Sequence, residues 1–484
     1  MKGVVIAGTG SGVGKTSIAT GLMSRLSKRR RVQAFKAGPD FIDPMYHAAA
    51  TGRPGRNLDS FMMSDDRIRN LVGYASADAD MCVVEGVRGL YEGFSGDGDL
   101  GSTAHIAKLL GFPVVLVIDT GSLTRSAAAI VKGFQAFDPD VRIAGVVLNK
   151  VSGSQHSDKL DAAFRTYCPD VEVLGKIRRD RDNALGQRHL GLETLHSYDN
   201  GEIEPLERLT DPVDIDALEG LMEDSPSDLP TGSPYVERAS GLSAAVPFDD
   251  AYSFYYRENL ECLEASGVSL RFFRPADGEP MPNADMAYLG GGYPELYADR
   301  ISDNTDFMEG LRRMAEDGRP VLGECGGLMT MCSELRDKNG RIHPMSGVFD
   351  AMADFVDRRH GPTYVIEEAS ASNPLFEGTV RGHEYHYSEV VPRTGRYCFS
   401  MKRGMGIADG MDGLMDHRSV GTYMHQHALS MDDWAAGLVR ATESTRNRYP
   451  GRISERHVIY SKRRKQIQLE GNGLCFIHSN SHNV

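Results

Sequence analysis

The N-terminal half of the chain alternates short apolar runs with longer amphipathic stretches. Runs of this length and composition are typical of buried parallel strands, and the amphipathic stretches at 16–28 and 122–137 are typical of helices. The alternation predicts an α/β domain, in which helices cover both faces of a parallel sheet. The predicted strands are VVIAG (4–8), MCVVEG (81–86), VVLVID (114–119) and IAGVVLNK (143–150).

A second α/β series begins near residue 242. Its apolar runs are LSAAVPF, VSLRFF, MAYLGGG and RPVLGECGG, and we expect helices near 252–266 and 305–317. The stretch between the two series, EDSPSDLPTGSPYVERAS, is rich in Pro, Ser, Asp and Gly and has no apolar period, which is typical of an exposed linker. The pattern therefore predicts two α/β domains rather than one continuous domain.

These boundaries divide the 484 residues into four parts. We expect a first domain over residues 1–222, a linker over 223–241, a second domain over 242–445 and a polar tail of unknown role over 446–484. A chain of this length is too long for a single hydrophobic core, in agreement with two domains.

Charge and cysteine usage narrow the range of functions. The formal net charge is −13, so a general role in nucleic-acid binding, which usually requires a basic surface, is not expected. No apolar run reaches the roughly 20 residues that a membrane-spanning helix needs, so no membrane partner is expected. The seven cysteines are dispersed and lack metal-binding spacing, which is typical of reduced thiols. Because the N-terminus also lacks the pattern of a signal peptide, we expect a cytoplasmic protein.

The segment GTGSGVGKTS, residues 8–17, stands between the first predicted strand and the first predicted helix, which is the context of a phosphate-binding loop. Its glycines let backbone N–H groups turn toward anionic oxygens, and the helix N-terminus adds partial positive charge. Lys15 would reach the terminal phosphates of ATP, and the Thr16 hydroxyl would bind Mg²⁺. Thr9 stands where the common spacing has glycine, so the loop is a variant form. The residues of this loop that we expect to bind ATP are Gly10, Gly12, Val13, Gly14, Lys15, Thr16 and Ser17.

Acidic residues follow the ends of later predicted strands. Lys36 ends the strand VQAFK, which we expect beside the first strand, and Asp40 and Asp43 come directly after it in KAGPDFIDP. Glu85 ends the strand that precedes the loop GVRGLYEG. Because ligands of open α/β sheets bind at the carboxyl ends of the strands, these acids should lie near the phosphates. Thr16, Asp40 and Glu85 are the predicted Mg²⁺ ligands, since Mg²⁺ prefers hard oxygen donors.

A second chemical motif, VLGECGGL at 321–328, places Cys325 at a sharp turn between a strand and glycines. Such an elbow exposes a nucleophile at a strand-to-helix junction, where nearby backbone N–H groups can hold an oxyanion. His425, in GTYMHQH, is the candidate base. The candidate residues of an oxyanion and substrate pocket are Gly326 and, from the block YLGGGYPEL, Gly291 and Gly292. The other cysteines are expected to be structural thiols: Cys82, Cys168, Cys262, Cys332, Cys398 and Cys475.

Taken in order, these motifs resemble those of the cobyrinic acid a,c-diamide synthase family over about residues 1–445. The resemblance also rests on GSTAHIAKLLG (101–111), RSAAAIVKGF (125–134), GVVLNKV (145–151), RGHEYHYS (381–388) and YMHQH. It implies an α/β fold in which a P-loop, dethiobiotin-synthetase-like parallel-sheet domain precedes a class I glutamine amidotransferase domain. It also implies ATP- and L-glutamine-dependent amidation of the a and c acetate side chains of a tetrapyrrole, with Mg²⁺ as cofactor.

The resemblance also implies roles for single residues. It places Asn149 near the adenine and makes Cys325 the nucleophile and His425 its base. The residues that it assigns to the site of ATP, Mg²⁺ and the acid substrate are Lys15, Thr16, Lys36, Asp40, Asp43, Glu85 and Glu92.

Two positions depart from the family pattern. Ordinary class I amidotransferases have Glu two residues after the catalytic His, and here that position is His427. Cobyrinate enzymes commonly read EGVMGLYDG, whereas this chain reads EGVRGLYEG with Arg88, a form that resembles archaeal members acting on nickel sirohydrochlorin for coenzyme F430. The third member of the thiol site and the tetrapyrrole (cobyrinate, hydrogenobyrinate or nickel sirohydrochlorin) therefore stay open.

The predicted reaction is phosphorylation of a substrate carboxylate, followed by attack of ammonia that Cys325 releases from glutamine. Lys36, Arg88 and Arg125 are candidates for holding carboxylates of a polycarboxylate tetrapyrrole, although Arg125 can instead cap or pair on its own helix. The alternative is a P-loop ATPase switch or metallochaperone with a non-catalytic amidotransferase-like module. Such switches often have Lys where this loop has Gly10. A homodimer through the ATP domain is left open.

Overall fold

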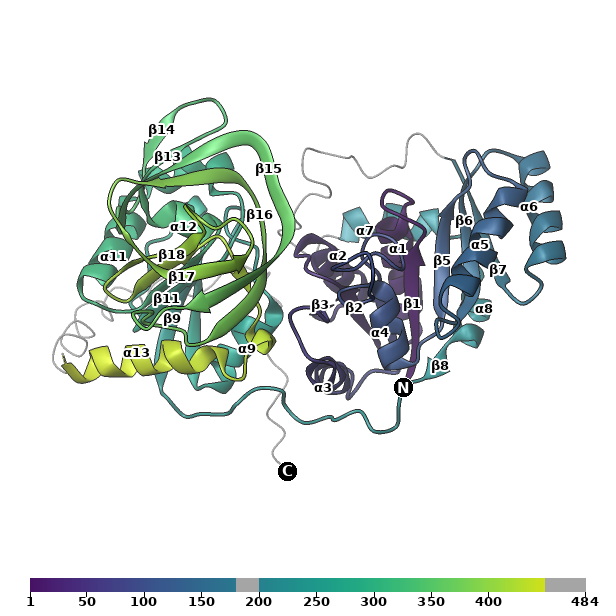
Figure 1. Cartoon of the computed structure of the whole chain (residues 1–484), viewed down its shortest axis with the longest axis horizontal. Helices are drawn as coiled ribbons and strands as arrows, with labels where there is room; N and C mark the ends of the chain where they lie inside the picture. Colours follow the sequence, from purple (N-terminus) through teal and green to yellow (C-terminus); the bar gives the residue numbers. More distant parts are fainter. Residues whose placement is uncertain (180–199, 449–484) are drawn as a thin grey trace, which may run out of the picture.

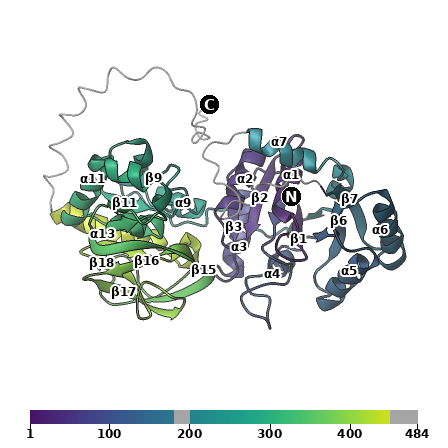
Figure 2. The same cartoon turned by 90° about the horizontal axis from the view of Figure 1, so that it is seen from above.

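The structure is a computed structural model that describes residues 1–179 and 200–448. These residues form two α/β halves that lie side by side, each built on its own sheet (Figure 1). The same separation is visible from above (Figure 2). The two α/β units predicted from the apolar runs are therefore confirmed.

The first half contains a parallel sheet of seven strands in the order β3-β2-β4-β1-β5-β6-β7, with the short strand β8 antiparallel to β1. Its strands are β1 (Lys2–Gly8), β2 (Val32–Ala37), β3 (Arg56–Leu58), β4 (Met81–Glu85), β5 (Val114–Asp119), β6 (Ile143–Val151), β7 (Glu172–Arg178) and β8 (Glu223–Asp224). Its helices are α1 (Lys15–Ser27), α2 (Ile42–Thr51), α3 (Asp65–Ala75), α4 (Thr103–Leu110), α5 (Arg125–Phe137), α6 (Ser154–Tyr167), α7 (Asn200–Leu209) and α8 (Ile215–Leu221).

Helices cover both faces of this sheet. Val4 and Ile6 of β1 share an apolar cluster with α1, α2, α7 and α8, whereas Val5 and Ala7 share another with α3, α4, α5 and α6. Successive side chains of a strand point to opposite faces, so a continuous apolar strand buries both. This arrangement leaves the carboxyl ends of the strands as the edge where loops meet.

The expected position of strand VQAFK was wrong in one respect. β2 pairs with β4, not with β1, because β4 is inserted between them and pairs with both. The order of strands along the chain does not specify this arrangement, since β4, which comes after β2 and β3 in the sequence, lies between β1 and β2 in the sheet. The consequence is direct: Glu85 at the end of β4 is the register partner of Lys36 on one side and of Ile6 on the other.

The second half contains a mixed sheet whose parallel part has the order β10-β9-β11-β12-β19. An extension, largely antiparallel, continues through β18, β17, β15, β13 and β14, with β16 and β20 beside it, and the apolar runs did not predict it. Its strands are β9 (Leu242–Pro247), β10 (Val268–Phe273), β11 (Met286–Leu289), β12 (Val321–Glu324), β13 (Cys332–Arg336), β14 (Ile342–Pro344), β15 (Phe349–Ala369), β16 (Thr379–Pro392), β17 (Arg396–Arg403), β18 (Met411–Asp416), β19 (Ser419–Thr422) and β20 (His425–Gln426).

Helices again cover both faces of the parallel part. Side chains of α11 and α12 pack into one apolar cluster and those of α9 and α13 into another. The helix expected near 252–266 begins only at Arg257, because the residues before it form turns that bury Tyr252 and Phe254. The helices are α9 (Arg257–Ala265), α10 (Ala298–Asp303), α11 (Thr305–Glu316), α12 (Gly326–Met331) and α13 (Trp434–Arg448).

The segment between the halves is less exposed than the linker prediction implied. Glu223 and Asp224 pair with β1, and Tyr235 is buried, with its hydroxyl donating to Glu261 Oε2 at 2.9 Å. Most other side chains of this segment are exposed or half-buried, as expected. The predicted tail overlaps α13 at its first residues, and 449–484 lie outside the described residues.

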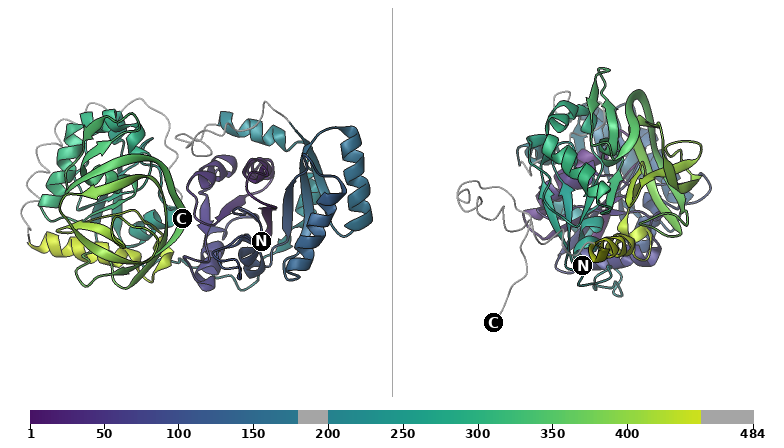
Figure 3. Two further views of the ribbon diagram at one scale, coloured as in Figure 1. Left: turned by 45° about the horizontal axis from the view of Figure 1, so that its top comes forward. Right: turned by 90° about the vertical axis from the view of Figure 1, so that its left-hand side faces the viewer.

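The two halves lie side by side in the left view of Figure 3, and side chains of one contact side chains of the other. Arg56 of the first half pairs with Glu258 at 3.1 Å and with Glu261 at 2.8 Å in the second. Tyr364 donates from its hydroxyl to Asp59 Oδ2 at 2.7 Å, and one apolar cluster contains residues of both halves. In the part of the chain that the structure describes, no helix has the length and hydropathy of a membrane span.

Candidate active site

The phosphate loop occupies residues 9–14, between the end of β1 and the start of α1. Gly14 adopts a φ of 91° and lies against Asn149: a Cβ atom at Gly14 would come within 2.4 Å of Asn149 Nδ2. That amide donates to the carbonyl oxygen of Val13 at 2.8 Å. Asn149, which the sequence analysis placed near the adenine, holds the phosphate loop by this contact, and glycine is required at position 14 for the close approach.

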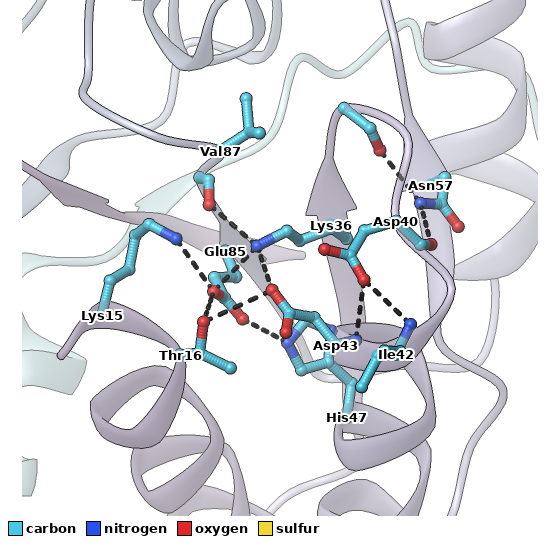
Figure 4. Close-up of polar contacts among 12 residues, drawn as sticks. Lys15, Thr16, Lys36, Asp40, Ile42, Asp43, His47, Asn57, Glu85 and Val87 are labelled. Carbon is cyan, nitrogen blue, oxygen red and sulfur yellow. Dashed lines mark hydrogen bonds and ion pairs between the residues drawn. The ribbon is translucent and has the colours of Figure 1, made fainter. Parts of the chain in front are cut away.

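A charged cluster lies where this loop meets the ends of β2 and β4 (Figure 4). Glu85 Oε1 accepts hydrogen bonds from Lys15 Nζ at 3.0 Å, Lys36 Nζ at 2.9 Å and Thr16 Oγ1 at 2.7 Å. Asp43 Oδ2 accepts from Thr16 Oγ1 at 3.3 Å and from Lys36. The structure thus brings together five of the side chains predicted for the phosphate and acid sites.

Burial and neighbouring charges set the ionisation of this cluster. Burial would raise the pKa of Glu85, but Lys36 and Lys15 hold that pKa well below its ordinary value. The pKa of Lys36 is raised, because Asp43 and Glu85 outweigh the effect of burial. The pKa of Lys15 is lowered by burial and by Lys36, and that of Asp43 is raised to about 6 by burial, Asp40 and Glu85.

Asp40 differs from Asp43 in its contacts. Asp40 Oδ1 accepts from the backbone N–H groups of Ile42 at 2.8 Å and Asp43 at 3.0 Å, so this side chain caps the start of α2. The hydroxyl of Thr16 contacts Asp43 instead. Of the two acids in KAGPDFIDP, the one predicted to bind substrate is therefore the nearer to the phosphate loop.

The oxygens of this cluster suit Mg²⁺, which usually takes one or two carboxylates together with phosphate oxygens. The Thr16 hydroxyl and the Glu85 and Asp43 carboxylates supply hard oxygen atoms that converge. Within the described residues, no three His, Cys, Asp or Glu side chains are arranged to hold a metal by themselves.

His47 belongs to the cluster and was missed by the sequence analysis. Its Nε2 lies 2.7 Å from Glu85 Oε2, and both side chains are fully buried. The spacing of four residues between Asp43 and His47 on α2 was an available signal, since residues four apart share one helix face.

Three further predicted residues lie on the surface. Arg88, Glu92 and Arg125 are exposed, and Glu92 Oε2 accepts from the backbone N–H of Gly89 at 3.1 Å. Arg88 follows the end of β4 in the left-handed conformation, with φ 49°. Arg125 is the first residue of α5. These side chains are available to a ligand but make no part of the charged cluster.

The predicted elbow is present at Cys325, which joins β12 to α12 with φ 48° and ψ −100°. A non-glycine residue with positive φ is strained, and such strain is common at functional sites. The Cys325 N–H donates to the Thr422 carbonyl at 2.8 Å, which ties the elbow to β19. Burial and the nearby Glu295 carboxyl raise the pKa of the thiol, so it is protonated at neutral pH and requires a base.

The glycine block closes around this elbow. A Cβ atom at Gly326 would lie 3.1 Å from the backbone N of Gly292, and one at Gly291 would lie 2.4 Å from His425 Cε1. The backbone of Gly292 therefore lies close to Gly326 in the elbow, and the imidazole of His425 packs against the same glycine block. This convergence is the arrangement that an oxyanion pocket needs.

His425 is buried, and its Nδ1 has no hydrogen-bond partner within the described residues. Its ring stacks on His383 with centroids 5.0 Å apart, and burial, His383 and His386 lower its pKa well below the ordinary value. A neutral imidazole of this kind can accept a proton.

His427 stands at the position where ordinary class I amidotransferases have the third residue of the thiol site, but its contacts are with Leu429 and Glu258. Its Nδ1 accepts from the Leu429 N–H at 3.1 Å, and its Nε2 lies 3.4 Å from Glu258 Oε2. Because Glu258 also pairs with Arg56, His427 belongs to the contact between the halves rather than to His425.

Glu295 was also missed by the sequence analysis. It follows the glycine block in η2 (Pro294–Leu296), and its Oε2 is buried without a hydrogen-bond partner among the described residues. Burial raises its pKa to about 7. The signal in the sequence that could have identified Glu295 was its position directly after GGGYP.

Two family models match the two halves. One described as a CobQ/CobB/MinD/ParA nucleotide binding domain matches residues 4–192, and one described as a CobB/CobQ-like glutamine amidotransferase domain matches residues 243–433. A solved glutamine amidotransferase matches 41% of this chain and 98% of its own at 14% identity, with a TM-score of 0.32.

Curated relatives match the chain across both halves. The cobyrinate a,c-diamide synthase of Methanosphaera stadtmanae is 42% identical over 455 residues, 91% of this chain and 99% of that protein. The enzyme of the same name from Methanothermobacter thermautotrophicus is 42% identical over 447 residues, 90% of this chain and 98% of that protein. The chain therefore belongs to the cobyrinate a,c-diamide synthase family and is a glutamine-dependent amide-forming ligase with a nucleotide-binding domain and a glutamine amidotransferase domain.

Proposed function

We propose that this ligase uses ATP and L-glutamine to amidate the a and c acetate side chains of a polycarboxylate tetrapyrrole. The observation that carries the proposal is the presence, in one chain, of the phosphate-loop cluster around Glu85 and the thiol elbow at Cys325, with the halves in direct contact. The names of the relatives, which span both halves, support the tetrapyrrole as the acceptor.

In the first half, a substrate carboxylate oxygen attacks the γ-phosphorus of ATP, and ADP leaves. The resulting acyl phosphate is attacked at carbon by ammonia, and phosphate leaves with the amide formed. Lys15 and Lys36 offset negative charge on the phosphates and the carboxylate. Thr16, Glu85 and Asp43 would hold Mg²⁺, which supplies further charge neutralisation when bound. Asp43 takes this place rather than Asp40, because Asp43 contacts the Thr16 hydroxyl and Asp40 caps α2.

In the second half, Cys325 attacks the side-chain amide carbon of glutamine. His425 takes the thiol proton and returns it to the departing ammonia, and water then hydrolyses the glutamyl thioester. The N–H groups of Gly326 and Gly292 stabilise the oxyanion that forms during both attacks. Gly291 leaves room for the imidazole ring of His425.

Glu295 completes the proposed glutamine pocket. Its buried Oε2, which has no hydrogen-bond partner among the residues that the structure describes, belongs to the segment that follows Gly292, and its charge acts on the Cys325 thiol. An ionised carboxylate there would bind the α-ammonium group of glutamine and offset the cost of its own burial.

Cobyrinate, hydrogenobyrinate and nickel sirohydrochlorin are the acceptors to compare, and EGVRGLYEG with Arg88 favours the nickel compound. Purified enzyme is incubated with each tetrapyrrole, ATP and glutamine, and the amide groups are counted by mass spectrometry. A diamide from at least one acceptor is expected, and the absence of a diamide from all three would overturn the proposal.

We also propose a cytoplasmic location, because the cysteines of the described residues are free thiols.

A further inference from the structure

Phe41 of the first half lies among aromatic rings of the second. Its ring centroid is 5.2 Å from Phe254, with which it stacks, and 5.0 Å from the catalytic candidate His425. It is 4.6 Å from Tyr256 and 5.6 Å from His383.

Phe41 lies in the loop that carries Asp43, a member of the charged cluster of the first half. Phe41 stands between Asp40, which caps α2, and Asp43, which contacts Thr16 and Lys36. The Asn57 side chain donates to the carbonyl of Asp40 at 2.8 Å and anchors this loop to β3. A ligand that rearranges the contacts of Asp43 therefore acts on backbone only two residues from Phe41.

The ring of His425 has close neighbours from both halves. Gly291 approaches it so closely that a Cβ atom would clash, and Phe41 and His383 lie within ring-contact distance of it. A buried imidazole without a hydrogen bond at Nδ1 depends on such packing for its orientation. The Phe41 ring is therefore one of the contacts that fix the orientation of the His425 imidazole.

We propose that Phe41 is a positioning residue that transmits occupancy of the ATP and acid-substrate site to His425, so that glutamine hydrolysis accelerates when the acceptor site is filled. This inference rests on the proposed function. In this proposal, the loop that carries Asp40, Phe41 and Asp43 is the element that responds to the ligand, because its side chains contact both sites.

The test compares full-length wild type with Phe41→Ala. Glutaminase activity is measured with and without ATP, Mg²⁺ and the tetrapyrrole that the wild type amidates, and amidation is measured separately with added ammonia. Loss of Phe41 should reduce the stimulation of glutaminase by about fivefold or more, the lower end of usual coupling between sites. Ammonia-dependent amidation should stay near the wild-type rate.

A second readout separates positioning from a general structural role. Burial lowers the pKa of His425, so water admitted in place of the Phe41 ring should raise it toward the ordinary value. His383 and His386 are the titratable groups that act on it. The acidic limb of glutaminase kcat/KM should therefore move to higher pH in Phe41→Ala, and Phe41→Tyr should restore both the profile and the stimulation.

Tyr74→Ala is the matched control, because Tyr74 is also a half-buried ring of the first half near the second but contacts Tyr235 and Arg56 instead. Tyr74→Ala should keep the stimulation of glutaminase by ATP and the acceptor.

If Phe41→Ala does not fold, as judged by thermal unfolding, Phe41→Leu is measured and judged by the same criteria. Undiminished stimulation in a folded variant overturns the inference and leaves the proposed function intact. Loss of ammonia-dependent amidation also overturns the inference, and absence of amidation by the wild type overturns the proposed function with it.

Discussion

Lys36 and Glu85 face one another across β2 and β4: their Cα atoms are register partners, and Nζ lies 2.9 Å from Oε1. Both side chains are almost fully buried, with exposed fractions of 3% and 0%. Taking two charges out of water is costly unless each finds a partner, and here each also contacts other members of the cluster. The pair therefore links the stability of the sheet edge to the chemistry of the phosphate site.

Glu85→Gln should destabilise the first half strongly, because it leaves Lys36 as a buried charge with one partner fewer. Breaking a buried pair usually costs about 3–5 kcal/mol, measured here by urea unfolding. Lys28→Ala, which removes an exposed ion pair with Glu207 on the same half, should cost less than about 1 kcal/mol. Equal losses in the two variants would contradict the importance of burial.

The same pair gives a pH dependence of defined sign. The pKa of Glu85 is lower in the folded than in the unfolded protein, so its contribution to the free energy of unfolding is present above the unfolded value. That contribution should fall as pH drops below about 4, the ordinary range for glutamate. Urea unfolding of wild type and Glu85→Gln at several pH values checks this, because the difference between them should shrink in acid.

Cys325→Ala should abolish glutamine-dependent synthesis and keep synthesis from added ammonia, because only the first route uses the thiol. The amide product is measured with each nitrogen donor in turn. Cys262→Ala removes a buried thiol on α9 and should keep both activities. Persistence of glutamine-dependent synthesis in Cys325→Ala would show that the thiol assignment is wrong.

Lys15→Ala should remove both activities, since each requires an activated carboxylate. Loss of a charge that stabilises the transferred phosphoryl group commonly lowers kcat by about 10²-fold or more. Lys28→Ala, at the other end of α1, is the matched lysine control. Survival of either activity at the wild-type rate in Lys15→Ala would count against the phosphate loop.

Glu295→Gln should raise the KM for glutamine by about tenfold or more, the usual value of a hydrogen bond to a charged group. Because burial raises the pKa of Glu295 to about 7, the KM of the wild type should fall as pH rises through about 7 and the carboxyl ionises. Ammonia-dependent synthesis should not change. Glu309→Gln, on the exposed face of α11, is the control, and an unchanged KM in Glu295→Gln would remove the residue from the pocket.

Local motifs carried most of what the sequence predicted. The phosphate loop and the Cys325 elbow are set by a few consecutive residues, because a strand end, a turn and a helix start are short-range features. Apolar runs predicted most of the parallel strands for the same reason, but not β3, β7 or β19. The antiparallel extension from β13 to β18 was not predicted, since its polar and apolar residues alternate without one long apolar run.

The sequence by itself determined the two α/β units, the family, and the residues that begin each chemical site. Only the tertiary structure decided which of them meet: β4 lies between β1 and β2, Asp43 rather than Asp40 reaches Thr16, and His427 turns to Glu258. It also brought Phe41 to His425. The physical reason is that strand order, helix facing and domain contact depend on packing between residues far apart in the chain, which no local pattern records.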